Sequence, residues 1–98
     1  MQRKTADVMT YEWDENKREL NKIKHGLDFA LVEFVFNDPK KLDIVDNRKD
    51  YGEARRCVIG KIGNRIFFVV YTVRNESIRI ISFRTAKEKE RRKYYGNS

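Results

Sequence analysis

The chain has 98 residues, of which 40% are hydrophobic and 38% charged, and its formal net charge is +7. This length suits one domain with a modest core, and six Phe with five Tyr exclude an intrinsically disordered chain. No apolar run reaches the roughly 20 residues that a membrane span needs. The single cysteine, Cys57, cannot form an internal disulfide, and no signal peptide is evident, so we expect a soluble cytoplasmic protein.

The chain contains no internal repeat and no Gly/Ser/Pro-rich linker. We therefore expect residues 10–98 to form a single domain, preceded by a flexible segment over residues 1–9. Met9 is a candidate translation start, because the patterned sequence begins directly after it.

Local signals predict a short strand and two helices at the start of this domain. Residues 11–13 indicate the strand, and Asp14 is a good N-cap for a helix that ends near His25, with Gly26 as its left-handed terminal residue. The apolar stripe of this helix is narrow and consists of Leu20, Ile23 and then Leu27. Asp28 is the expected N-cap of a second helix over residues 29–36, which is apolar nearly all round and should be buried.

The second half of the domain predicts four strands and a final helix. The strands cover residues 42–46, 53–62, 65–74 and 77–84, and the two-residue connections Gly63-Asn64 and Asn75-Glu76 predict hairpins. The segment 65–74 is apolar on both faces and should be the central strand. Thr85 is the expected cap of a very basic helix over residues 86–95. The predicted order β-α-α-β-β-β-β-α indicates an α+β fold, with the helices packed on an antiparallel sheet.

The positive charge favours a polyanionic partner, with nucleic acid as the first choice. An acidic protein partner remains open, because charge does not distinguish binding a polyanion from cutting one. The basic final helix likewise has two interpretations: Lys87 contacts phosphate, or the helix is solvated and faces a partner.

No P-loop, HExxH motif or metal-spaced Cys/His cluster is present, so the sequence predicts neither a metal nor a cofactor. RNA cleavage by the ribose 2′-OH needs only a proton acceptor, a proton donor and cations that stabilise the phosphorane. Arginines held on a sheet can supply the cations.

The predicted sheet carries five such arginines. Alternation places Glu53 and Arg55 on one face, while further arginines stand near the ends of the last two strands: Arg65, Arg74, Arg79 and Arg84. Glu53 is the carboxylate best placed to act as a base or to orient an arginine. The alternative is that these residues form cross-strand ion pairs at a solvated edge.

The remaining candidates have two interpretations each. His25 has the only side chain with an ordinary pKa near neutrality, but as an imidazolium it could also stabilise the end of its helix. Tyr71 could stack on a base or pack in the core, and Cys57 is expected to be buried filler.

The ordered set of motifs resembles the BrnT-type toxins over nearly the whole chain. The matching residues are Tyr11-Glu12-Trp13-Asp14, Asn16-Lys17, Asn21, Lys24-His25-Gly26, Phe29, Asp38-Pro39, Glu53-x-Arg55, Gly60, Val70-Tyr71-Thr72, Arg79-Ile80-Ile81-Ser82-x-Arg84-x-Ala86, Glu90-Arg91 and Tyr94-Tyr95. Val73, Phe83 and Thr85 depart from the family pattern beside candidate site residues.

The resemblance implies a RelE-like fold and a ribonuclease that blocks translation. It also implies neutralisation by a BrnA-type antitoxin, which would dimerise, bring two toxin copies into one assembly and bind operator DNA. Carried over to this chain, the catalytic candidates are Glu53, Arg55, Arg79, Arg84 and His25. The RNA-binding candidates are Lys24, Arg65, Arg74, Lys87 and Tyr71. The alternatives are a nucleic-acid-binding module without catalysis and a subunit that only binds a partner.

Overall fold

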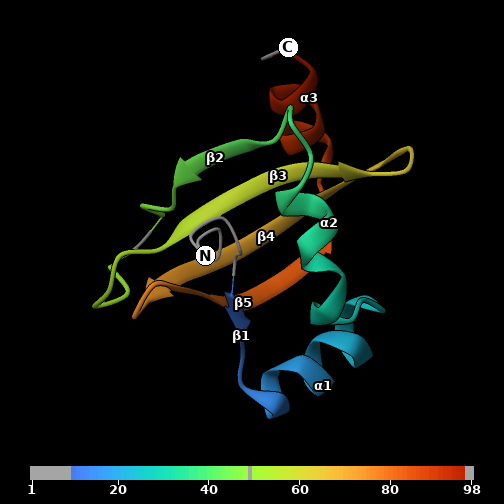
Figure 1. Ribbon diagram of the computed structural model, residues 1–98. Coiled ribbons are helices and arrows are strands. Elements are labelled where there is room, and N and C mark those ends of the chain that lie inside the picture. Colours follow the sequence, from blue (N-terminus) through green and yellow to red (C-terminus); the bar gives the residue numbers. More distant parts are fainter. Residues whose placement is uncertain (1–9, 49, 97–98) are drawn as a thin grey trace, which may run out of the picture.

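The computed structural model describes residues 10–48 and 50–96, and it confirms the α+β class. A five-stranded sheet has the order β1-β5-β4-β3-β2 and carries helices on both faces (Figure 1). The elements are β1 (Thr10–Glu12), α1 (Glu15–His25), the 3₁₀ helix η2 (Phe29–Leu31), α2 (Val32–Phe36), β2 (Leu42–Val45), β3 (Arg56–Ile62), β4 (Arg65–Arg74), β5 (Ser77–Thr85) and α3 (Glu88–Gly96). The predicted flexible segment, residues 1–9, lies outside the described residues.

The sheet is mixed, so the prediction of a fully antiparallel sheet is wrong. Strands β2 to β5 do form an antiparallel meander, with both predicted two-residue hairpins and with β4 at the centre. Strand β1, however, pairs with β5 in the parallel sense, with Glu12 opposite Arg79. A parallel pair needs a long crossover, and the helices and strands between β1 and β5 supply it. No local sequence signal reports such a pairing.

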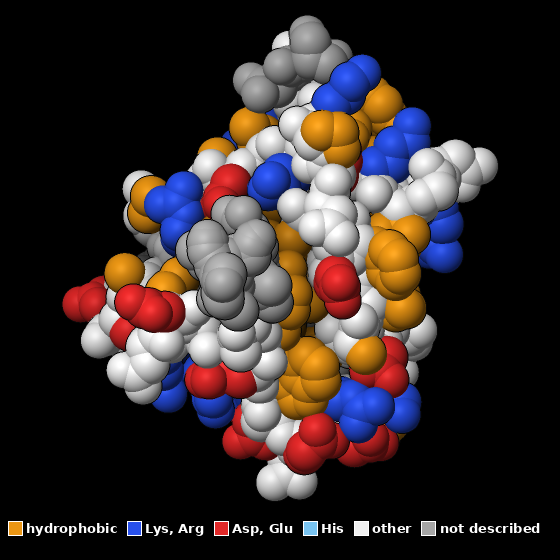
Figure 2. Space-filling view, in the orientation of Figure 1, with side chains coloured by type: hydrophobic (Ala, Val, Ile, Leu, Met, Phe, Trp, Pro, Cys, Tyr) orange, Lys and Arg blue, Asp and Glu red, His pale blue; other side chains and the backbone are white. Residues whose placement is uncertain are grey.

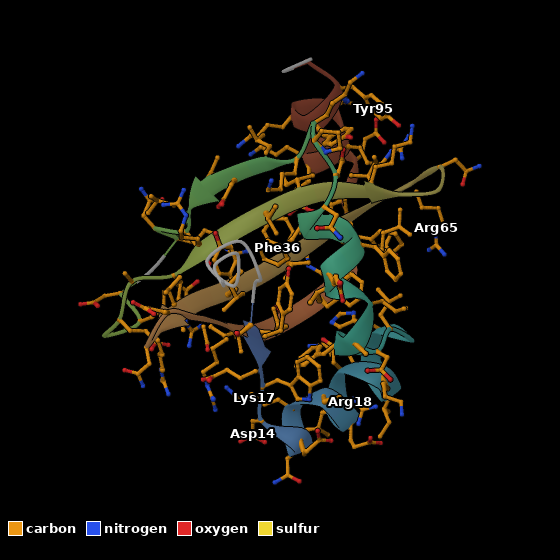
Figure 3. The ribbon with its side chains drawn as sticks, viewed as in Figure 1. Asp14, Lys17, Arg18, Phe36, Arg65 and Tyr95 are labelled. Carbon is orange, nitrogen blue, oxygen red and sulfur yellow. The ribbon has the colours of Figure 1, made fainter. Side chains whose placement is uncertain are left out.

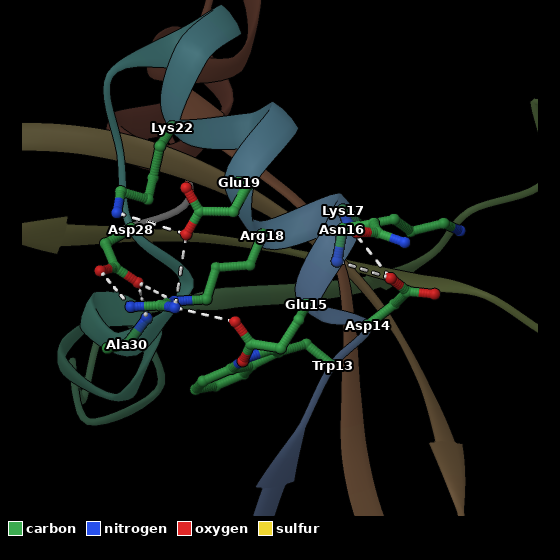
Figure 4. A network of polar contacts seen from close by, with 10 residues as sticks. All are labelled: Trp13, Asp14, Glu15, Asn16, Lys17, Arg18, Glu19, Lys22, Asp28 and Ala30. Carbon is green, nitrogen blue, oxygen red and sulfur yellow. Dashed lines mark hydrogen bonds and ion pairs between the residues drawn. The ribbon is translucent and has the colours of Figure 1, made fainter.

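Helix α1 begins and ends where the sequence predicts. The Asp14 carboxylate accepts hydrogen bonds from the Asn16 and Lys17 backbone N–H groups, and Gly26 is left-handed with φ 70°. Figure 4 shows how Arg18 then ties α1 to the start of η2, donating hydrogen bonds of 2.8 and 2.9 Å to the two carboxylate oxygens of Asp28. Asp28 also caps η2, as predicted.

The predicted second helix is not one regular helix. Residues 29–36 form a 3₁₀ turn followed by the five-residue α2, so α1 is the only N-terminal helix longer than two turns among the described residues. Burial is one-sided: Phe29, Val32, Val35 and Phe36 face the sheet, whereas Leu31 and Phe34 are exposed. The prediction that this segment is buried on all sides, made from its apolar composition, is therefore only partly right.

The face of α1 that meets the sheet was also predicted wrongly. Leu20 and Ile23 are 63% and 81% exposed, and the buried residue of the helix is Asn21. Strand β1 ends beside Arg79, so the edge of β5 beyond that point lacks a neighbouring strand. The Asn21 side chain takes its place, donating to the Phe83 carbonyl at 2.8 Å and accepting from the Phe83 N–H at 3.2 Å. A side-chain amide thus continues the hydrogen bonding of the sheet.

The core has two parts, one on each face of the sheet. The larger cluster joins η2 and α2 to residues of all strands except β2, and Phe36 lies between α2 and the sheet (Figure 3). Gly60 permits the close approach of α2, because a Cβ there would lie 2.7 Å from Val35 Cγ1. The smaller cluster lies on the other face, where Tyr94 and Ala86 pack against β3 and β4. No helix in the described part of the chain is long and apolar enough to cross a membrane.

The start of α3 differs from the prediction. Thr85 is the last residue of β5 and accepts a hydrogen bond from Arg65, so it is not the helix cap. The Lys87 N–H instead donates to the Glu90 carboxylate at 2.8 Å. Glu90 therefore satisfies a free N–H group at the start of α3.

Candidate functional site

Four of the five predicted arginines lie on the α3 side of the sheet. Strand register and alternation place Arg74, Arg79 and Arg84 there, since the Arg84 guanidinium lies 4.2 Å from the centre of the Phe68 ring. Arg55 belongs to the same side, because the next residue, Arg56, contacts Asp43 on the α2 side. Helix α3 covers only one end of this face, against β3 and β4. We call the arginine-bearing α3 side of the sheet the arginine face.

Arg84 is the most buried of the four arginines on this face. Its guanidinium donates two hydrogen bonds to the Glu90 carboxylate, at 2.9 and 2.8 Å, while it lies against Phe68. Both side chains of the ion pair are largely buried, with 16% and 18% exposed. Burial is the largest single influence and raises the pKa of Glu90, but the hydrogen bonds from Arg84 and the Lys87 N–H, together with the charges of these two residues, outweigh it, so the net shift is downward. A further hydrogen bond to the Thr85 carbonyl, at 3.2 Å, completes a well-oriented guanidinium.

Glu53 lies between two arginines, so it is suited to orienting them rather than to accepting a proton. Arg74 contacts one of its carboxylate oxygens at 3.2 Å and Arg55 the other at 3.3 Å. These arginines lower the pKa of Glu53, which makes it a weak base. Arg79 forms a further ion pair, at 3.0 Å, with Glu12 of the neighbouring β1. Every arginine on this face therefore has a carboxylate partner. This agrees with the alternative interpretation of the sequence, in which these residues form ion pairs.

A chain of contacts joins these two ends of the arginine face. The Arg55 guanidinium lies 4.1 Å from the centre of the Tyr51 ring, and the Tyr51 hydroxyl donates to Asp46. Asp46 has a fully buried side chain and accepts two hydrogen bonds from Arg48, which holds its pKa at about 2. Arg48 in turn lies 5.4 Å from the Phe68 ring centre, beside Arg84.

His25 stands at the border of the same face. It lines a groove between α1 and β5 together with Lys17, Lys24 and Ser82, and Ser82 is two residues before Arg84 on the same strand. Partial burial lowers the pKa of His25, and the positive charges of Lys24 and Arg84 lower it further. The imidazole is therefore neutral at pH 7, which favours a proton acceptor over the charged helix-end role that the sequence also allowed.

Two residues that the sequence predicts to bind RNA, Tyr71 and Arg65, lie on the α2 side of the sheet, away from the arginine face. Tyr71 is 4% exposed and packs against Phe36 on the α2 side, with its hydroxyl donating to Asp43. Burial and then the Asp43 carboxylate raise its pKa. Arg65 is also on the α2 side, at the β3–β4 hairpin, where its guanidinium lies 5.3 Å from the Phe67 ring centre (Figure 3). Alternation along β4 puts both residues opposite to Arg74.

The α2 side does not offer a continuous basic surface. Figure 2 shows that acidic and basic side chains are mixed there, with hydrophobic side chains between them. Lys87, by contrast, is exposed next to Ala86 at the start of α3, on the side of the arginine face. Cys57 is buried as predicted, and burial raises its pKa to about 11. Within residues 10–48 and 50–96, no three His, Cys, Asp or Glu side chains are grouped so that they could hold a metal ion.

Sequence reasoning missed the residues that position the arginines. Glu12 meets Arg79 only through the parallel β1–β5 pair, and Tyr51, Asp46 and Arg48 come from the loop after β2, which carries no motif. Glu90 had a usable signal, because an acidic residue in the first turn of a helix commonly binds free N–H groups there.

Comparison with known protein families agrees with this geometry. The family model of the ribonuclease toxin BrnT, of type II toxin–antitoxin systems, matches residues 13–90. This range contains α1, the arginine face and Glu90, and membership implies a cognate antitoxin as a partner. No curated protein matches the sequence closely enough to add an individual relative. The chain therefore belongs to the BrnT family of ribonuclease toxins of type II toxin–antitoxin systems.

Proposed function

We propose that this protein is a metal-independent endoribonuclease whose active site is centred on His25 and Arg84. The observation that carries the proposal is a histidine with a lowered pKa in a groove lined by Ser82, which lies two residues before the largely buried, carboxylate-oriented Arg84 on β5. A neutral imidazole and a fixed guanidinium are the two groups that cleavage by the 2′-OH requires.

In the proposed reaction His25 accepts the proton of the ribose 2′-OH while the 2′-oxygen attacks the adjacent phosphorus. The bond from phosphorus to the 5′-oxygen breaks, and the products are a 2′,3′-cyclic phosphate and a 5′-hydroxyl, protonated by the imidazolium or by water. Arg84 and Lys24 stabilise the added negative charge of the phosphorane. Glu90 holds Arg84 in place during the reaction.

The second group of arginines suits binding of the RNA backbone. Arg55, Arg74 and Glu53 together retain one positive charge, and Arg79 extends the row towards β1. Phosphate contacts of this kind position a nucleic acid without reading its sequence. Lys87 is the corresponding candidate at the α3 end.

The proposal is tested with purified antitoxin-free protein and single-stranded RNA in the presence of EDTA. Cleavage is expected, and Arg84→Ala or His25→Ala should reduce its rate by about tenfold or more, equivalent to about 1.4 kcal/mol of transition-state stabilisation. Arg79→Ala should also reduce it. Arg65→Ala is the matched control, because this arginine lies on the opposite face of the same sheet. Equal rates for all four variants would contradict the site assignment.

A second function, RNA binding without cleavage, is favoured by one observation: every arginine of the arginine face is paired with a carboxylate. It predicts salt-sensitive binding with no cleavage products in the same assay.

For the ribonuclease, we further propose action in the cytoplasm, inhibition of translation and neutralisation by a BrnA-type antitoxin. That antitoxin would bind operator DNA and carry two toxin copies, which the mass of the purified complex would test.

A further inference from the structure

A pocket opens on the arginine face on the far side of Arg84 from His25. It lies between β2, β3 and α3 and has a volume of about 280 Å³. This is slightly below the roughly 300–1,000 Å³ typical of small-molecule sites, so it suits one small planar group. We call it the α3 pocket.

The walls of the α3 pocket combine an apolar interior with a polar, basic rim. Phe68, Cys57 and Ile59 are buried beneath it, and the partly buried Ile44 of β2 completes its apolar wall. The rim carries cations at three positions: Arg48, Lys89 and Lys93. Neither lysine forms an ion pair with another described residue, and the two carboxylates in the lining, Asp46 and Glu90, are bound to arginines.

Asn47 adds a hydrogen-bonding group to this rim. Its exposed side chain lines the pocket and has no hydrogen bond within residues 10–48 and 50–96. A carboxamide offers both a donor and an acceptor, which is the pattern that the edge of a nucleobase presents in complementary form. The neighbouring guanidiniums of Arg48 and Arg84 offer flat, cationic surfaces on which a base can stack.

We propose that the α3 pocket binds one nucleobase of single-stranded RNA, next to the phosphate held at Arg84. This inference rests on the proposed ribonuclease function, and it names the element that gives the cleavage its base preference. Arg84 connects the two sites because it contacts Phe68 and Glu90 in the pocket wall and acts electrostatically on His25. Lys89 and Lys93 hold the phosphate that follows the bound base.

The experiment measures binding separately from cleavage. Four 2′-O-methyl tetranucleotides, of adenine, cytosine, guanine and uracil, are titrated into the isotope-labelled full chain and followed by NMR. They cannot be cleaved, because the attacking hydroxyl is blocked. We expect saturable shifts at the Asn47 side-chain amide and the Ile44 methyl groups, with one base bound more tightly than the others. Asn47→Ala should reduce that difference between bases.

Lys93→Trp should fill the rim of the pocket, remove one of its cations and weaken binding by about tenfold or more. Lys40→Trp is the matched control, since it makes the same change at another exposed lysine, which does not line the pocket. Absence of shifts at Asn47 and Ile44, equal binding by both tryptophan variants, or the same shifts with inorganic phosphate alone would overturn the proposal. Pocket binding by a protein that cleaves no RNA would refute the ribonuclease and leave the base site standing.

Discussion

The most direct test of how the structure holds its site is the substitution Asn21→Ala. Asn21 is buried and makes three hydrogen bonds: two with the Phe83 backbone and one, at 3.1 Å, to the Leu27 carbonyl. Phe83 is fully buried, so its N–H and carbonyl would lose a partner in an apolar environment. Each such unsatisfied group costs about 1–3 kcal/mol. Alanine regains about 0.5 kcal/mol of helix propensity, and the net expected loss for the two groups is about 1.5–5.5 kcal/mol.

Equilibrium unfolding in urea, followed by far-UV circular dichroism, measures this loss as a lower midpoint at an unchanged slope. Asn16→Ala is the matched control: it makes the same change on the same helix, where the side chain is exposed and only the backbone N–H bonds to Asp14. Because α1 also carries His25, Asn21→Ala should reduce RNA cleavage as well. If the two variants agreed in stability within about 0.5 kcal/mol, Asn21 would not have the structural role assigned to it.

Three further predictions concern close packing, a strained turn and pH. Gly60→Ala should destabilise the protein by about 1–3 kcal/mol, measured by urea unfolding. The new Cβ would lie 2.7 Å from Val35 Cγ1 and 2.9 Å from the Val35 carbonyl oxygen. An unchanged unfolding midpoint would show that α2 can move away at no cost. Glu76→Gly should stabilise the protein by about 0.5–1 kcal/mol and raise the midpoint of thermal unfolding. Asn75 and Glu76 have φ 49° and 66° in their type I′ hairpin, and glycine adopts a positive φ without steric cost. A lower midpoint would show that Glu76 is not strained. The lowered pKa of His25 means that the unfolded chain binds this proton more readily, so the free energy of unfolding should fall as the pH drops through and below 6.5, and His25→Gln should make that fall shallower. The same slope in both proteins would refute the shift.

The pH dependence also separates the two roles considered for His25. A proton acceptor must be neutral, so cleavage should increase with pH, with a midpoint below the ordinary value of 6.5, and then level off. Retention of full activity at pH values where the imidazole is charged would favour the helix-end role and move the base elsewhere.

The sequence by itself determined the elements whose signals are local. The Asp14 cap, the left-handed Gly26, both two-residue hairpins and the central position of β4 depend on residues a few positions apart, and all are confirmed. Simple alternation would place Arg79 and Arg84, five residues apart, on opposite faces; a bulge in β5 opposite Val70/Tyr71 shifts the pattern by one residue and brings them to one face, which the local sequence did not report. The family resemblance, which sums many weak local matches, was likewise readable and correct.

Only the tertiary structure decided which partners these residues meet. The parallel β1–β5 pair, the burial of Asn21 in place of Leu20 and the inward position of Tyr71 arise from contacts between distant segments, such as Asn21 with Phe83. An amphipathic pattern reports which side chains prefer burial, but it does not report an unpaired strand edge that needs a hydrogen-bonding side chain. For the same reason the carboxylate beside each arginine, and the pocket on the far side of Arg84, became visible only once the chain was folded.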